Sequence, residues 1–301
     1  FCDHSAQDIV DMLLHEAEKV GVQIRLKSEV SEVVPYASGF RVNVATSKGK
    51  TAIEAYALDA PRVVLASGGL SLPKIASDLA YRTARDLGMS VVAPSPALVP
   101  LTWNNADKAE FAALSGVAVD CEITCYRQSF RENLLFTHRG LSGPAILQAS
   151  SYWRPGDDVN INLLPALDVL SWLRQLQQDR GKMLLSTALK NLLPNRLIEA
   201  VIDCWFDDQI LGDMNAVQCE QVARCLQAWR FRPGGTEGYR TAEVTLGGLA
   251  TTEFSSKSFE AKGYPGLYAI GEALDVTGWL GGYNFQWAWA SGYCCAQNLS
   301  S

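Results

Sequence analysis

The chain has 301 residues, of which 48% are hydrophobic and 19% charged, and its formal net charge is −6. This composition is that of a globular protein and excludes a disordered, collagenous or coiled-coil chain. The length predicts about two domains, and the acidic balance argues against a protein that coats nucleic acid through its overall charge. Eight cysteines without CxxC spacing and three histidines predict no zinc site. We expect buried, reduced thiols in a cytoplasmic protein.

The first 96 residues have the pattern of an α/β nucleotide-binding domain. Helical spacing of apolar residues runs from Ser5 to Gly21, and alternating segments at 22–26, 40–44 and 52–58 predict strands. A short apolar run at 63–66 then stops at Gly68 and Gly69. A continuous apolar run of this kind is typical of a parallel strand that is covered on both faces.

The pattern changes twice in the middle of the chain. Strand-like pieces predict the first part of a β-barrel-like insert at 97–163, and helical spacing predicts a helical insert at 164–232. A second strand signal, at 244–246, predicts that the barrel-like insert returns at 233–248. The nucleotide-binding domain would then consist of residues 1–96 and 249–301, and we expect the runs 63–66 and 267–270 to be neighbours in its sheet.

The strongest local signal is the buried strand at 267–270, which ends at Gly271 and Glu272 and is followed by Asp275. A carboxylate delivered by such a strand can accept hydrogen bonds from a polyol, and a glycine lets backbone approach a ligand closely. Taken singly, each glycine could merely make a turn, and Glu272 could be a surface residue. The combined order of strand, Gly-Glu, loop and helix favours a ligand site.

A helix is predicted at 284–298, directly after Gly281, Gly282 and Tyr283. Its free N–H groups would point at the ligand, Asn284 would cap it, and Tyr283 would face the ligand's ring. No charged residue occurs from 276 to 301, but the glycines, Asn and Gln there exclude a membrane span. We therefore expect a helix that is buried on all its faces inside the protein, and we expect no contact with a membrane.

Four stretches together resemble one flavoprotein family. They are VVLASGGLSLP (63–73), LFTHRGLSGP (135–144), EVTLGGL (243–249) and LYAIGEALDVTGWLGGYN (267–284). The chain is similar over its whole length to the BaiN/RdsA-type oxidoreductases, also called HI0933-like or aminoacetone-oxidase-like. The resemblance implies a glutathione-reductase-like FAD-binding domain with two dinucleotide folds, interrupted by a β-barrel insert and a helical insert.

The resemblance also implies the chemistry. FAD would carry a hydride through its N5 atom to or from an activated C=C or C–N bond, with NAD(P)H as reductant. The substrate would be a small molecule or an RNA base, since members of the family reduce conjugated double bonds or form dihydrouridine in ribosomal RNA. His138 would act in catalysis, with a structural hydrogen bond as the alternative, and Tyr283 would be a second catalytic residue.

The cofactor contacts that the pattern and the resemblance imply together involve the backbone of Val30 at the adenine and the residues Gly68, Gly69, Gly271, Glu272, Asp275, Gly281, Gly282, Tyr283 and Asn284.

One family element is missing. The GxGxxG loop that holds the FAD pyrophosphate occurs nowhere in the sequence, and the chain begins at Phe1. We expect a preceding segment of the same protein to supply this loop, and an exposed apolar surface where that segment would pack. The alternative function is a non-catalytic fragment or binding module that does not hold FAD.

Overall fold

The computed structural model describes residues 4–48 and 51–299, so Phe1 and Cys2 lie outside the described residues. The chain forms two compact units, residues 1–63 and 64–301. The boundary between them falls inside the range 1–96 that the sequence assigns to one domain segment. No helix in the described ranges is both long enough and apolar enough to cross a membrane.

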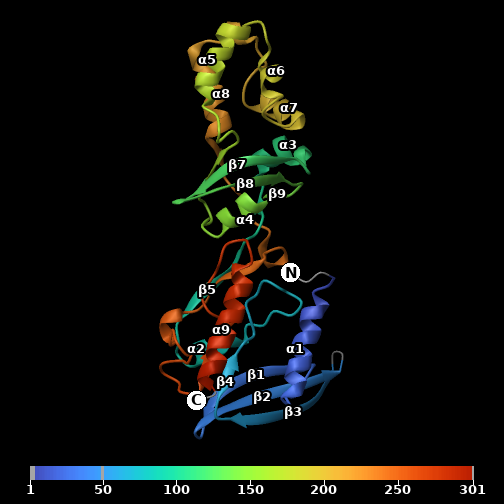
Figure 1. The fold of residues 1–301 in the computed structure, drawn as a ribbon, viewed down its shortest axis with the longest axis vertical. Helices are drawn as coiled ribbons and strands as arrows, with labels where there is room; N and C mark the ends of the chain where they lie inside the picture. Colours follow the sequence, from blue (N-terminus) through green and yellow to red (C-terminus); the bar gives the residue numbers. More distant parts are fainter. Residues whose placement is uncertain (1–3, 49–50, 300–301) are drawn as a thin grey trace. The chain divides into compact units, whose positions relative to one another are not determined.

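The first unit combines one helix with an antiparallel meander (Figure 1). Helix α1 (Gln7–Lys19) has no buried residue. Strands β1 (Ser28–Tyr36), β2 (Gly39–Lys48) and β3 (Thr51–Ala60) follow in order. The strand predicted at 22–26 is not formed, and β1 begins only at Ser28. The alternating side chains of that segment are exposed, so no packing rewards an extended conformation there.

A seven-stranded antiparallel sheet forms the middle of the second unit, in the order β11-β10-β7-β8-β9-β6-β12. Its long hairpin has alternate buried side chains on both strands, as expected for a sheet with one face on a core. The strands are β6 (Leu101–Thr102), β7 (Ala118–Cys125), β8 (Gln128–Phe136), β9 (Gly140–Ser142), β10 (Val159–Asn162), β11 (Trp229–Phe231) and β12 (Gly235–Thr236).

Helices cover this sheet and extend from it (Figure 1). They are α3 (Asn105–Phe111), α4 (Pro144–Ser150), α5 (Val169–Arg180), α6 (Leu185–Leu189), α7 (Asn195–Cys204) and α8 (Ala216–Gln227). One apolar cluster, which includes Phe111, Phe136 and Trp229, joins these helices to the sheet. The sheet resumes at β11, which lies inside the range 164–232 predicted to be a helical insert.

The remaining part of the second unit positions the candidate site. Strand β4 (Val63–Leu65) pairs with β14 (Leu267–Ala269), which confirms that these two apolar runs are neighbours. Strand β5 (Val91–Ala97) pairs with β13 (Val244–Leu249), so β13 belongs to this ribbon and not to the seven-stranded sheet. Helix α2 (Leu79–Asp86) buries Tyr81 against the same region.

The last helix, α9 (Tyr283–Leu299), contradicts the expectation of burial on all sides. Only Ser291 and Cys295 are buried, and Phe285 and Tyr293 are 73% and 69% exposed. An apolar sequence predicts a helix that is covered on all sides, but composition does not show what packs on a helix. The cysteine expectation also needs correction, because Cys204 and Cys294 are exposed.

Candidate functional site

Glu272 joins three chain segments at the end of β14. Its Oε1 accepts a hydrogen bond from the Thr245 backbone N–H at 2.6 Å and another from the Ser71 hydroxyl at 3.1 Å. Thr245 Oγ1 in turn accepts from the Leu70 N–H at 2.7 Å. This network ties the loop after β4 to β13, and the second carboxylate oxygen, Oε2, has no hydrogen-bond partner among the described residues.

Gly69 is required by this network. A Cβ at position 69 would lie 2.4 Å from Thr245 Oγ1 and 2.6 Å from Glu272 Oε1. Both distances are far below a van der Waals contact, so any side chain would push the loop away from the strand and the carboxylate. The structure therefore brings together Gly69 and Glu272, two of the predicted cofactor residues.

The charge of Glu272 affects the pKa of two tyrosines. Burial, and then the Glu272 carboxylate, raises the pKa of Tyr81 to about 12, and the same two causes raise the pKa of Tyr239. The hydroxyls of both tyrosines and of Ser67 are buried without a hydrogen-bond partner in the described part of the chain. Buried polar atoms of this kind call for a water molecule or a polar ligand group.

Asp275 lies three residues after Glu272, and its carboxylate is better placed than that of Glu272 to bind a ligand. Its backbone N–H donates to the Leu249 carbonyl at 2.9 Å, which fixes its position. The carboxylate is half-buried and makes no hydrogen bond with the described residues. It can accept hydrogen bonds from ligand hydroxyls without giving up an existing contact.

The loop before α9 is closed by Asn284. Its Oδ1 accepts from the Gly278 N–H at 2.8 Å, and its Nδ2 donates to the Gly278 carbonyl at 3.1 Å. Asn284 therefore does not cap the helix as predicted, because α9 already begins at Tyr283 and the side chain bonds backward to the loop. Gly282 has φ +89° and open space where a Cβ would point, which leaves backbone accessible at the helix start.

These features fit a flavin. A 17-residue helix presents its first N–H groups, and Gly68, Gly271 and Gly282 leave backbone open to a ligand because a Cβ there would meet nothing within 4 Å. The carboxylate of Asp275 and three buried hydroxyls offer polar contacts. The glycines with positive φ in this group are Gly68, Gly271, Gly281 and Gly282.

His138 lies on a loop that other residues hold rigid. Thr137 Oγ1 accepts from the Gly140 N–H at 3.0 Å, and Trp103 Nε1 donates to the Thr137 carbonyl at 3.0 Å. The neighbouring Arg139 pairs with Glu237 at 3.4 Å. His138 itself is exposed and contacts neither Glu272 nor Asp275 by a described hydrogen bond.

Sequence reasoning missed the residues that support the site. Thr245, Tyr81 and Tyr239 were not selected, although Thr245 lies within the segment 243–249 whose glycines were noticed. A threonine two residues before a Gly-Gly pair, within an otherwise apolar strand, is the signal that could have found it. Val30 lies in β1, within the first unit, where the register shifts between Val30 and Glu32.

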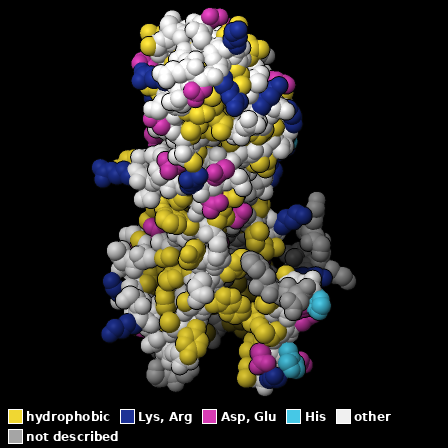
Figure 2. All heavy atoms as spheres, turned by 45° about the horizontal axis from the view of Figure 1, so that its top comes forward, with side chains coloured by type: hydrophobic (Ala, Val, Ile, Leu, Met, Phe, Trp, Pro, Cys, Tyr) yellow, Lys and Arg dark blue, Asp and Glu magenta, His cyan; other side chains and the backbone are white. Residues whose placement is uncertain are grey.

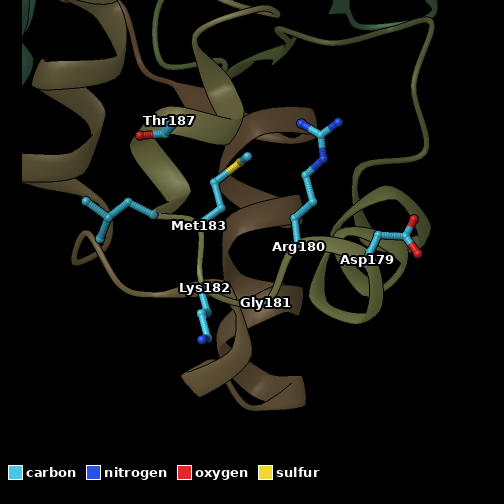
Figure 3. A pocket seen from close by; sticks show the side chains of 7 residues that line it. Asp179, Arg180, Gly181, Lys182, Met183 and Thr187 are labelled. Carbon is cyan, nitrogen blue, oxygen red and sulfur yellow. The ribbon is translucent and has the colours of Figure 1, made fainter.

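One cavity lies elsewhere, at the turn between α5 and α6 (Figure 3). It measures about 670 Å³ and is lined by residues 179–184 and Thr187. The side chains of Asp179, Arg180 and Lys182 diverge from one another around it, so they do not converge on a ligand. The lining of this cavity therefore does not form a ligand-binding site.

Apolar side chains are exposed near the start of α9 and on the loop after β4, and Figure 2 shows such areas on one face of the molecule. Exposed apolar side chains that lie together can mark a binding face. The exposed residues are Leu72 (62%), Ile75 (77%), Trp279 (46%), Tyr283 (61%), Phe285 (73%) and Trp289 (51%).

The fold and the site define a mixed α/β protein with an inserted barrel and helical region. Residues 95–244 match the family described as "HI0933-like protein barrel and H2TH domain". The chain is 47% identical over 302 residues, 99% of its length and 73% of the relative's, to the ribosomal RNA dihydrouridine synthase of Escherichia coli (strain K12). The chain belongs to the HI0933-like family.

Two further relatives are informative. The ribosomal RNA dihydrouridine synthase of Haemophilus influenzae is 44% identical over 100% of this chain and 74% of its own. The 3-dehydro-bile acid delta(4,6)-reductase of Clostridium scindens is 28% identical over 96% of this chain and 72% of its own. All three relatives are named as enzymes, two as synthases and one as a reductase.

Proposed function

We propose that this protein is an FAD-dependent oxidoreductase that reduces uridine in ribosomal RNA to dihydrouridine, with NAD(P)H as reductant. The observation that carries the proposal is the 47% identity over 99% of the chain to a relative of that name. Two features of the site also support it: the Asp275 carboxylate makes no hydrogen bond with the described residues, and Gly282 leaves backbone open at the start of α9.

The residues that would hold FAD divide into two groups. Asp275 and Oε2 of Glu272 would accept hydrogen bonds from the ribityl hydroxyls, and the start of α9 at Gly281 and Gly282 would face the flavin's N1 and C2 carbonyl. When bound, the flavin supplies two-electron hydride transfer between the nicotinamide and the substrate double bond. Gly68, where a Cβ would meet nothing within 4 Å, would let backbone approach the cofactor, and Gly69 would act by keeping the loop against Thr245 and Glu272. The contact of Val30 with adenine stays a prediction from the resemblance.

Reduction of a C=C bond needs one hydride and one proton, and the proton must come from the protein or solvent. We assign the proton to His138 on its rigid loop, or to Tyr283 at the start of α9, because both are exposed and can meet a substrate. Thr137 and Trp103 hold the His138 loop in place without using the imidazole.

We further propose that a dinucleotide-fold segment with the GxGxxG loop covers the exposed apolar face at α9 and completes a glutathione-reductase-like FAD domain. The support is the exposure of that face and the relatives' greater length, of which this chain covers 73–74%. The domain ranges 1–96, 97–163, 164–232, 233–248 and 249–301 stay part of this proposal. An enzyme of ribosomal RNA would act in the cytoplasm.

The test is a reoxidation assay with the full-length protein. NADPH should reduce the bound flavin without oxygen, and ribosomal RNA from a strain that lacks the enzyme should reoxidise it. His138→Ala should keep the flavin spectrum and slow reoxidation about 10²- to 10⁴-fold, as for loss of a general acid. A protein that stays colourless with added FAD would instead support a non-catalytic binding module.

A second substrate class is favoured by the reductase relative. Its name describes reduction at conjugated double bonds of a bile acid, at 28% identity to this chain. A conjugated steroid ketone that reoxidises the flavin while ribosomal RNA does not would assign the protein to small-molecule reduction.

A further inference from the structure

A second cleft, of about 330 Å³, lies on the barrel side of the β5–β13 ribbon. Its two walls are the turns 153–156 and 233–236, and its floor is formed by Ser95, Pro96 and Leu246. The walls are rich in proline and glycine, so they offer apolar edges and open backbone. Apart from Leu246, none of its lining residues belongs to the sequence motifs or to the flavin site described above.

Both walls are held in place before any ligand arrives. Asp158 pairs with Arg230 and with Arg232, where the Arg232 Nε to Oδ1 distance is 2.7 Å, directly before the second wall begins. On the other wall, Trp153 Nε1 donates to the Asp157 carbonyl at 2.9 Å. A preformed cleft loses less conformational entropy on binding than a mobile one.

Arg154 supplies the charge of the cleft. Its Nη1 donates to the Trp153 carbonyl at 2.9 Å and to the Ser151 carbonyl at 3.4 Å, which folds the side chain against its own turn. Within residues 4–48 and 51–299 it forms no ion pair with a carboxylate. The guanidinium therefore keeps Nε and Nη2 for an anion, and arginine binds phosphate oxygens well.

The cleft is linked to the flavin site through one strand. Successive side chains of a strand point to opposite faces. Thr245 faces Glu272 and Gly69, whereas its neighbour Leu246 lines the cleft. A ligand in the cleft therefore lies across β13 from the site at Glu272, and it would not compete with a cofactor held there.

We propose that this cleft binds a nucleoside phosphate unit of the RNA next to the reduced uridine. Arg154 would hold the phosphate, Ser95 would hydrogen-bond the sugar or base, and Pro96, Pro155 and Leu246 would contact the base. The inference rests on the proposed function for the identity of the RNA. A chain with net charge −6 needs such local sites, because its overall field repels a polyanion.

The experiment measures the affinity of the full-length protein for ribosomal RNA from a strain that lacks the enzyme, across a series of salt concentrations. Arg154→Ala should weaken binding about 10- to 100-fold, the usual effect of a lost charge-assisted hydrogen bond. It should also lower the slope of log affinity against log salt by about 0.7, the value for one phosphate contact in single-stranded RNA. Arg154→Lys should restore most of the salt slope.

Two further variants separate a site from general charge or misfolding. Arg127→Ala removes an exposed arginine that lies over Tyr126 on the same barrel and outside the cleft, and it should leave both affinity and slope near wild type. Ser95→Phe fills the cleft without changing charge, and it should raise the KM for RNA. Thermal unfolding of each variant confirms that it is folded.

The outcomes distinguish this inference from the proposed function. If Arg154→Ala and Arg127→Ala lower the affinity for RNA equally, the cleft is not a binding site and the inference is wrong. If Arg154→Ala instead raises the KM for NADPH in flavin reduction without RNA, the cleft holds the pyridine nucleotide and the RNA assignment is overturned. If RNA binds through Arg154 but is never reduced, the inference stands and the proposed function fails.

Discussion

Removing the Glu272 carboxylate should destabilise the protein as well as weaken its hold on flavin. In Glu272→Ala the Thr245 N–H and the Ser71 hydroxyl both lose their acceptor, at present 2.6 Å and 3.1 Å away. Leaving a buried donor unpaired costs about 1–3 kcal/mol, so the two donors together should cost about 2–6 kcal/mol. For a unit of this size that corresponds to a fall in Tm of about 4–24 °C.

The assay is thermal unfolding of the flavin-free protein, followed by near-UV circular dichroism. Glu272→Gln keeps a neutral oxygen acceptor and should lose only about 1–2 kcal/mol. Glu243→Ala removes an exposed carboxylate beside β13 and is the matched control, expected within about 0.5 kcal/mol of wild type. An unchanged Tm in Glu272→Ala together with lost flavin would refute the network and make Glu272 a ligand contact alone.

Three other results are expected. Burial and Glu272 raise the pKa of Tyr81 to about 12, above the value near 10 of an unfolded tyrosine. The free energy of unfolding, measured with urea, should therefore be at its full value below about pH 10 and should fall between about pH 10 and pH 12. Equal stability at pH 10 and pH 12 would contradict the burial of the phenol. Burial raises the pKa of the Cys121 thiol to about 12, so iodoacetamide at neutral pH should modify the exposed Cys294 and spare Cys121, as read by peptide mass mapping. Asp275→Ala should weaken FAD binding about 10- to 150-fold by flavin fluorescence titration, and Asp275→Asn should recover part of it; normal affinity in both would remove Asp275 from the site.

Parts of the fold could be predicted because they depend on local pattern. The apolar runs of β4 and β14 are short, continuous and followed by glycine, and that is enough to place them as neighbouring buried strands. The segment 22–26 has the alternating pattern of a strand, but in the described part of the chain it has no neighbouring strand with which to pair. Pattern alone does not show whether a neighbour exists.

The site was only partly predictable because its supporting contacts are remote in sequence. Glu272 was selected as a ligand carboxylate, yet its Oε1 is engaged by Thr245 and Ser71, 27 and 201 residues away along the chain. Asn284 has the right residue type and position for a cap, but a nearby loop backbone competes for its amide. Such competition between partners is decided by tertiary geometry.

The exposure of α9 illustrates the same limit for packing. Its sequence is apolar on all faces, which is the pattern of a buried helix. The described residues cover only Ser291 and Cys295. The pattern does not show whether a ligand or another segment covers this face.

The central claim is tested most directly by mass spectrometry of ribosomal RNA. Nucleosides from a strain without the gene should lack one dihydrouridine, and the full-length protein with FAD and NADPH should restore it in isolated RNA. A uridine that gains two hydrogen atoms only when protein, flavin and NADPH are all present is the predicted result. Ribosomal RNA that stays unchanged while the flavin is reduced and then reoxidised by a conjugated ketone would contradict the account.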